Sequence, residues 1–174
     1  MPWSDSLYNL ADRGTGSLCF AMSYDNGHVL PNPPYLRAMA EVDAALRLAG
    51  HTTLRWSLPH ASQGNDLYLA QLIADGGEDL KRACATSAEP VLGGTVKGIV
   101  SKSLSTLSWW DLVHEKNRYL ARQLEAWNET SILTGTGRPA DAIVLPVAPY
   151  PSFLHGDREY VYYTVGKILA HTDA

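Results

Sequence analysis

The chain has 174 residues, 45% of them hydrophobic and 18% charged, with a formal net charge of -4. This is the length of one domain, or of one piece of a larger one. The mild acidity disfavours nucleic-acid binding, which needs a basic surface to neutralise phosphates. No apolar run approaches the roughly 18 residues of a membrane span, and the first residues lack the pattern of a secretory signal peptide. Cys19 and Cys84 form no disulfide framework, so we expect a reduced, cytoplasmic location.

The first third of the chain predicts a strand, a helix and a strand. Residues 17–30 are typical of two short strands joined by a hairpin turn at Asp25-Asn26-Gly27. Two prolines then precede a helical pattern over residues 35–49, and Gly50 is suited to end that helix. Residues 51–56 are rich in β-branched side chains and predict a strand. This order indicates a right-handed crossover in a mostly parallel or mixed sheet.

The middle of the chain predicts further helices. Residues 65–74 form one helical pattern, ended by Asp75-Gly76-Gly77, and residues 78–85 form a shorter one. Residues 90–103 hold three glycines and little periodicity, which predicts a loop.

The clearest predicted element is a long amphipathic helix from Thr106 to about Asn128. Its apolar stripe, which we expect to face the core rather than a ligand, consists of Trp110, Val113, Leu120, Leu124 and Trp127. Residues 142–148 are a continuous apolar run, typical of a strand buried on both faces, and Pro146 is expected to end it or cause a bulge. The predicted class is α/β, with a mixed sheet flanked by helices.

Common catalytic signatures are absent from the sequence. There is no Gly-x-Ser-x-Gly and no Ser-x-x-Lys. Neighbours in an extended segment point to opposite faces, so Ser101-Lys102-Ser103 would not bring its amine and hydroxyls together. The six histidines are dispersed and show no metal-ligand spacing. We therefore expect no metal and no cofactor.

One candidate cluster is His155-Gly156-Asp157, which follows the predicted strand over residues 142–148. In open α/β sheets, ligands gather at the carboxyl ends of the strands. A histidine and a carboxylate there could orient a substrate or transfer a proton. The other interpretation is a loop histidine whose ring bonds a neighbouring carbonyl.

Phrases along almost the whole chain resemble one family in a consistent order. The phrases are Gly16-Ser-Leu-Cys-Phe-Ala, Tyr24-Asp-Asn-Gly-His-Val-Leu-Pro-Asn-Pro-Pro34, Asp75-Gly-Gly77, Ser87-Ala-Glu-Pro90, Gly137-Arg-Pro-Ala-Asp-Ala-Ile143, Leu145-Pro-Val-Ala-Pro149, His155-Gly156 and Tyr160-Val-Tyr-Tyr-Thr164. Together they resemble the C-terminal half of fungal acetamidase-like enzymes of the amidase signature family. The resemblance implies a partial amidase signature fold, with a mixed sheet covered by helices.

The chemistry that the resemblance implies is hydrolysis of a carboxamide by a serine nucleophile, a second serine on a cis peptide bond, and a neutral lysine. A Gly/Ser-rich stretch supplies the oxyanion hole. In the family these groups lie upstream of the matched region, and no position here corresponds to them: the chain has no Ser-Ser dipeptide, and Gly93-Gly94 leads into Thr95. No catalytic residue is therefore carried over. His155, Tyr162 and Tyr163 are candidates to line the substrate pocket.

We accordingly expect residues 1–174 to form a single partial domain that resembles the C-terminal part of an amidase. Such a chain would be inactive alone and would meet a small amide substrate only when completed by the missing half. The resemblance also implies a fungal origin and a role in nitrogen or secondary metabolism. One alternative is a non-catalytic interaction protein that pairs or self-associates through its uncovered face. Another is a small independent hydrolase that uses His155 with Asp157.

Overall fold

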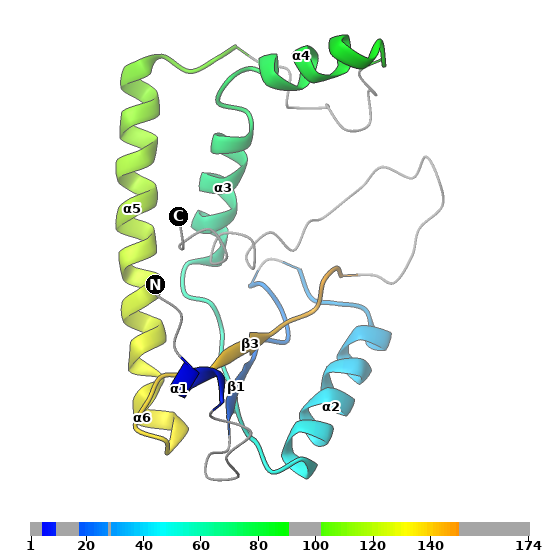
Figure 1. Ribbon diagram of the computed structural model, residues 1–174, viewed down its shortest axis with the longest axis vertical. Coiled ribbons are helices and arrows are strands. Elements are labelled where there is room, and N and C mark those ends of the chain that lie inside the picture. The colour runs from blue at the N-terminus through cyan, green and yellow to red at the C-terminus, as the bar shows by residue number, and fades with distance from the viewer. Residues whose placement is uncertain (1–4, 10–17, 28, 91–101, 150–174) are drawn as a thin grey trace.

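The computed structural model describes residues 5–9, 18–27, 29–90 and 102–149, and it has an α/β architecture (Figure 1). A three-stranded sheet is made of β1 (Cys19–Met22), β2 (Thr52–Arg55) and β3 (Ala142–Val144). The helices are α1 (Asp5–Tyr8), α2 (Pro33–Leu48), α3 (Ala61–Leu72), α4 (Glu78–Ser87), α5 (Thr106–Glu129) and α6 (Ser131–Thr134). The predicted α/β class, with helices flanking a sheet, is confirmed.

The sheet is centred on β1. Its order is β2-β1-β3, and both pairings are parallel, with Phe20 opposite Thr53 on one side and opposite Ala142 on the other. Cys19 and Ala21 have no exposed surface, and Met22 is 2% exposed. The middle strand is thus the most buried part of the sheet.

The predicted hairpin after β1 is wrong, although its turn exists. The Asp25 carboxylate accepts the N–H of Gly27 (2.8 Å), and the Asn26 side chain accepts the N–H of Val29 (2.8 Å). Gly27 has a φ of 73°, which a glycine adopts without strain. Val29 and Leu30 nevertheless form no strand. The physical reason is that β2 and β3 already occupy both hydrogen-bonding edges of β1.

The strand–helix–strand prediction that follows is confirmed. Helix α2 begins at Pro33 rather than residue 35, with prolines in its first turn, where an N–H has no intrahelical acceptor. Gly50, at φ 86°, ends it: its N–H donates to Arg47 O (3.0 Å), while His51 N–H donates to Leu46 O (3.0 Å). These two bonds form a Schellman motif, which turns the chain directly into β2.

Helices α3 and α5 lie side by side (Figure 1). Helix α3 begins at Ala61 rather than at the predicted residue 65. Ala61 is 7% exposed and packs with Leu58 and Trp56, which explains why the first turn joins the helix. Helix α4 matches its prediction closely, and α5 agrees with the predicted helix.

The predicted buried stripe of α5 is wrong in part. The residues of α5 that are buried are Tyr119 (0% exposed) and Gln123 (2%), whereas Trp110 and Leu124 are 59% and 60% exposed. Trp127 does pack as expected, edge to face against Trp56 with ring centroids 5.3 Å apart. The helix is rotated away from its most apolar stripe because Tyr119 packs against the glycine at position 64 of α3.

The last strand is shorter and more exposed than its sequence suggests. It ends at Val144, before Pro146, as predicted. Ala142 is exposed, and Ile143 and Val144 are half-buried. The prediction of burial on both faces is therefore wrong for the described residues, because β3 is an edge strand of the sheet that they form.

Candidate functional site

The residues predicted to line a substrate pocket lie outside the described part of the chain. This holds for His155, Tyr162 and Tyr163, and also for Asp157 and Ser101. Their roles stay predictions. The hollows that the described residues form include one at the carboxyl ends of the strands and one among the helices.

The first hollow, of about 220 Å³, lies beside the carboxyl ends of β1 and β2. It is lined by Met22, Tyr24, Asp43, Arg47, Thr53, Leu54 and Arg55. The Thr53 hydroxyl donates to the Asp43 carboxylate (2.5 Å), and Arg47 Nε donates to the same oxygen (3.1 Å). The Thr53 hydrogen bond is the main cause that holds the pKa of Asp43 below its ordinary value, with a smaller contribution from Arg47.

The other cationic side chain of this hollow, Arg55, also has a partner. The Arg55 guanidinium carbon lies 4.7 Å from the centroid of the Tyr24 ring, which is the geometry of a cation–π contact. The polar groups here hold the crossover helix α2 and the strand ends together. The hollow is thus built for structure more than for binding.

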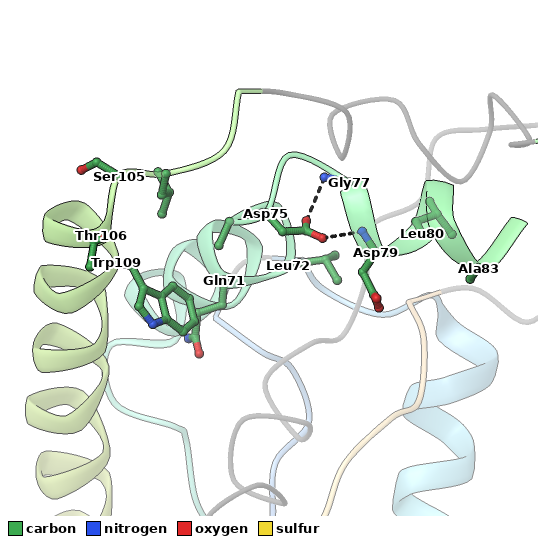
Figure 2. A pocket seen from close by; sticks show the side chains of 12 residues that line it. Gln71, Leu72, Asp75, Gly77, Asp79, Leu80, Ala83, Ser105, Thr106 and Trp109 are labelled. Atoms are coloured by element: carbon green, nitrogen blue, oxygen red, sulfur yellow. Dashed lines mark hydrogen bonds between the residues drawn. The ribbon is translucent and has the colours of Figure 1, made fainter. Parts of the chain in front are cut away.

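The second hollow is an open groove of about 800 Å³ between the end of α3, the start of α4 and the start of α5 (Figure 2). We call it the helix groove. Its lining residues are Gln71, Leu72, Ala74, Asp75, Gly77, Asp79, Leu80, Ala83, Leu104, Ser105, Thr106 and Trp109. Most of these side chains are apolar, and Leu72, Leu104 and Trp109 are each at least 40% exposed.

Backbone hydrogen bonds fix the walls of the helix groove. The Asp75 carboxylate accepts the N–H groups of Gly77 and Asp79, both at 2.8 Å, and so provides an acceptor for an N–H in the first turn of α4 (Figure 2). These bonds keep the pKa of Asp75 below its ordinary value. Leu104 N–H donates to Ala74 O (2.8 Å), which ties the segment before α5 to the end of α3.

The helix groove was not predicted from the sequence. Asp75-Gly76-Gly77 was predicted only to end a helix, and the predicted apolar stripe held Trp110, whereas the groove is lined by Trp109. An Asp followed two residues later by Gly, before a helix, is a signal for the cap. No pattern along the chain signals that three helix ends meet, so the groove follows from tertiary structure alone.

Cys19 is the one fully buried thiol among the described residues, and it is not suited to act as a nucleophile. It has no exposed surface, and burial raises the pKa of its thiol, with the Asp141 charge adding to the effect. Because the thiolate is the reactive form, a buried thiol with a raised pKa is inert. Cys19 therefore belongs to the core of the sheet.

The described residues hold neither a metal-binding cluster nor a membrane-spanning helix. No group of three or more His, Cys, Asp or Glu side chains among them is placed to hold a metal ion. None of the helices in these ranges is both long enough and apolar enough to pass through a membrane.

The chain matches a known protein family over almost its whole length. The sequence profile of the family described as Amidase matches residues 4–172. The chain belongs to the amidase family. This confirms the resemblance stated from the sequence.

The amidase-family chain is similar in sequence to several fungal proteins. It is 31% identical over 178 residues to an acetamidase of Emericella nidulans and to one of Aspergillus oryzae, in each case over 99% of this chain. It is 28% identical over 166 residues to "Amidase 1" of Gibberella moniliformis. The chain spans about a third of these relatives, 32%, 32% and 31% of their lengths.

A solved structure shows the same fold. The amidase-family chain superposes on a protein named fatty acid amide hydrolase with a TM-score of 0.69 and 20% sequence identity. The match covers 97% of this chain and 28% of that one. The predicted amidase signature fold is therefore confirmed.

Proposed function

We propose that this chain serves carboxamide hydrolysis as the part of an amidase scaffold that borders the substrate, and that it does not hydrolyse amides by itself. The observation that carries the proposal is the match to fungal acetamidases over 99% of this chain but only 32% of their length. The substrate would be a small amide, reached only when a second portion of the scaffold supplies the nucleophile.

The chemical argument rests on what acyl transfer requires. A serine hydroxyl is a weak nucleophile until a base activates it, and each lost oxyanion-hole donor costs roughly 2.7–4 kcal/mol of transition-state stabilisation. The sequence has no Ser-Ser dipeptide, and Gly93-Gly94 is followed by Thr95 rather than serine. These features support inactivity of the chain alone. In the completed scaffold, His155, Tyr162 and Tyr163 would line the substrate pocket.

The test is ammonia release from acetamide and a panel of small carboxamides. The purified full chain is assayed alone and after co-expression with the portion of the Emericella nidulans acetamidase that it does not match. We expect no saturable release from the chain alone and measurable release from the pair. In the pair, His155→Ala and Tyr162→Phe should raise KM more than they lower kcat if these residues line the pocket.

The same assay separates the alternatives. Saturable hydrolysis by the chain alone would overturn the proposal. If His155→Ala then abolished that activity, the independent hydrolase with His155 and Asp157 would replace it. A full-length fungal acetamidase is the positive control.

A specific observation favours the second candidate, a non-catalytic interaction protein. Three large apolar side chains of α5 are exposed, Leu107 by 65%, Trp110 by 59% and Leu124 by 60%. Side chains of this size are a usual feature of interfaces. Self-association would appear in light scattering after size exclusion, and a Trp110→Ser, Leu124→Ser double variant should abolish it. A monomer at high concentration argues against this candidate.

We also propose a cytoplasmic location and a role in nitrogen or secondary metabolism, without a nucleic-acid or membrane partner. The fungal amidase relatives and the two free cysteines support these assignments. Fractionation of a tagged chain tests the location. Induction of its transcript with an amide as nitrogen source tests the role.

A further inference from the structure

The helix groove is a wide hollow formed by described residues, and it belongs to no function assigned above. Its volume of about 800 Å³ lies in the range of small-molecule sites. Figure 2 shows Trp109 of α5 on one side and Leu80 and Ala83 of α4 on the other. Leu72, at the end of α3, lies between them. The groove therefore has an apolar floor and an aromatic side wall.

The charged groups of the groove have one sign. Asp75 and Asp79 are its only charged lining residues, and neither lysine, arginine nor histidine is among the residues that line it. Asp75 keeps its charge at neutral pH, because two backbone N–H groups bind the carboxylate. An apolar groove with two carboxylates favours a ligand that carries a positive charge on an apolar body.

We propose that the helix groove binds a small arylalkylammonium ion, with its apolar body against Trp109 and its charged nitrogen beside Asp75 and Asp79. Aliphatic amines are protonated at neutral pH, with pKa values of about 10 like that of lysine. The proposal does not depend on amide hydrolysis, since the chain can bind such an ion whether or not it is active.

Each part of the ligand has a stated partner. The aromatic body would stack on or against the indole, and burial of its surface drives association. The ammonium group would meet the field of two carboxylates at an exposed rim, so its share of the binding falls as salt rises. A carboxylate of the same size would meet repulsion in place of attraction.

The experiment uses the full chain and three probes of nearly equal size, measured by isothermal titration calorimetry at low salt. The probes are phenethylamine, neutral 2-phenylethanol and anionic 3-phenylpropionate. We expect saturable one-to-one binding of phenethylammonium, about fivefold or more tighter than the alcohol and about tenfold or more tighter than the acid. Raising the salt concentration should weaken the binding of phenethylammonium and leave the binding of the alcohol unchanged.

Matched variants locate the site. Asp79→Asn and Trp109→Ala should each weaken phenethylammonium about fivefold or more. Asp111→Asn on α5 and Leu133→Ala on α6 remove a carboxylate charge and an exposed apolar side chain outside the groove, and they should leave the affinity unchanged. Circular dichroism verifies that all four variants fold.

Three results would overturn the proposal. The first is no saturable binding of phenethylammonium. The second is equal affinity for the anionic probe. The third is unchanged affinity in both groove variants. None of these results bears on ammonia release, so failure here leaves the proposed function standing.

Discussion

The parallel sheet and the helix pair α3–α5 are held together in different ways. In the sheet, each parallel pairing is joined by backbone hydrogen bonds, which most side chains permit. In the helix pair, the contact depends on one large side chain meeting one glycine, Tyr119 against Gly64. The sheet therefore depends mostly on the backbone, whereas the helix packing depends on which side chains meet.

A single residue at the start of β3 reinforces the sheet. Asp141 N–H donates to Cys19 O (2.8 Å), and its carboxylate accepts Cys19 N–H (2.8 Å). The Arg138 guanidinium binds both oxygens of that carboxylate, at 2.8 and 3.0 Å. The three groups align β3 with β1 before the ladder begins.

The helix pair buries polar atoms that are not all hydrogen-bonded. Within the described part of the chain, the Tyr119 hydroxyl and Gln123 Oε1 are buried without a hydrogen-bond partner. Gln123 Nε2 donates to Pro59 O (2.9 Å), so only half of that amide is satisfied. At the exposed side of the pair, Gln63 bridges Glu115 (3.2 Å) and Arg122 (2.8 Å).

The largest predicted effect removes the large side chain of the helix pair. Tyr119→Ala should destabilise the chain by about 3–5 kcal/mol, because a fully buried ring is replaced by a cavity. Urea denaturation followed by circular dichroism measures the free energy of unfolding. Trp110→Ala, a similar truncation at a 59% exposed position of the same helix, is the control and should cost far less.

A smaller loss is predicted at the sheet. Asp141→Ala should cost about 1.5–3 kcal/mol, since it leaves Cys19 N–H without an acceptor and removes a charge-assisted bond. The same denaturation experiment measures it. If Glu129→Ala, an exposed acid with no role in strand alignment, cost as much, the proposed role of Asp141 would be wrong.

Adding one methyl group tests the glycine contact. A Cβ at position 64 would lie 2.8 Å from Tyr119 Cζ and closer still to its hydroxyl, so Gly64→Ala should cost about 1–2 kcal/mol despite the better helix propensity of alanine. In a Tyr119→Leu background the same change should cost nothing. An equal cost in both backgrounds would show that the ring is not the obstacle.

A still smaller change tests the unsatisfied hydroxyl. Tyr119→Phe keeps the ring and deletes an oxygen that has no partner, so stability should stay the same or rise by up to about 1 kcal/mol. The thermal midpoint measures the change. A clear loss of stability would mean that the hydroxyl is in fact bonded, for example through a buried water.

The smallest effect concerns acid sensitivity. Because the folded-state pKa of Asp43 is lowered from 3.8, its contribution to stability is present above pH 3.8 and is lost as pH falls through the folded-state pKa. Thr53→Val removes the hydrogen bond that is the main cause of the lowered Asp43 pKa. The free energy of unfolding should therefore fall less steeply as the pH is lowered below about pH 4.5. Thr52→Val is the matched control, and the same flattening in that variant would contradict the assignment.

Features that are set within a few residues were predictable, and features that are set by distant contacts were not. The end of α2 at Gly50, the start of α5 at Ser105–Thr106 and the end of β3 before Pro146 depend on backbone constraints within a few residues, and all were predictable. The absence of a strand after Gly27 was not predictable, because β2 and β3, which lie further along the chain, pair with both edges of β1. The helix groove was likewise not predictable, because it forms where the ends of three helices meet.

The α/β class, most of the helices and the membership of the amidase family follow from the sequence, because residue order and local backbone preferences carry that information. The buried side of α5, in contrast, is set by tertiary contacts. Its most apolar stripe stays partly exposed, and Tyr119 is buried instead, since a glycine on α3 admits an aromatic ring there. Periodicity reports how apolar a helix face is, whereas the shape of the neighbour selects the face that packs.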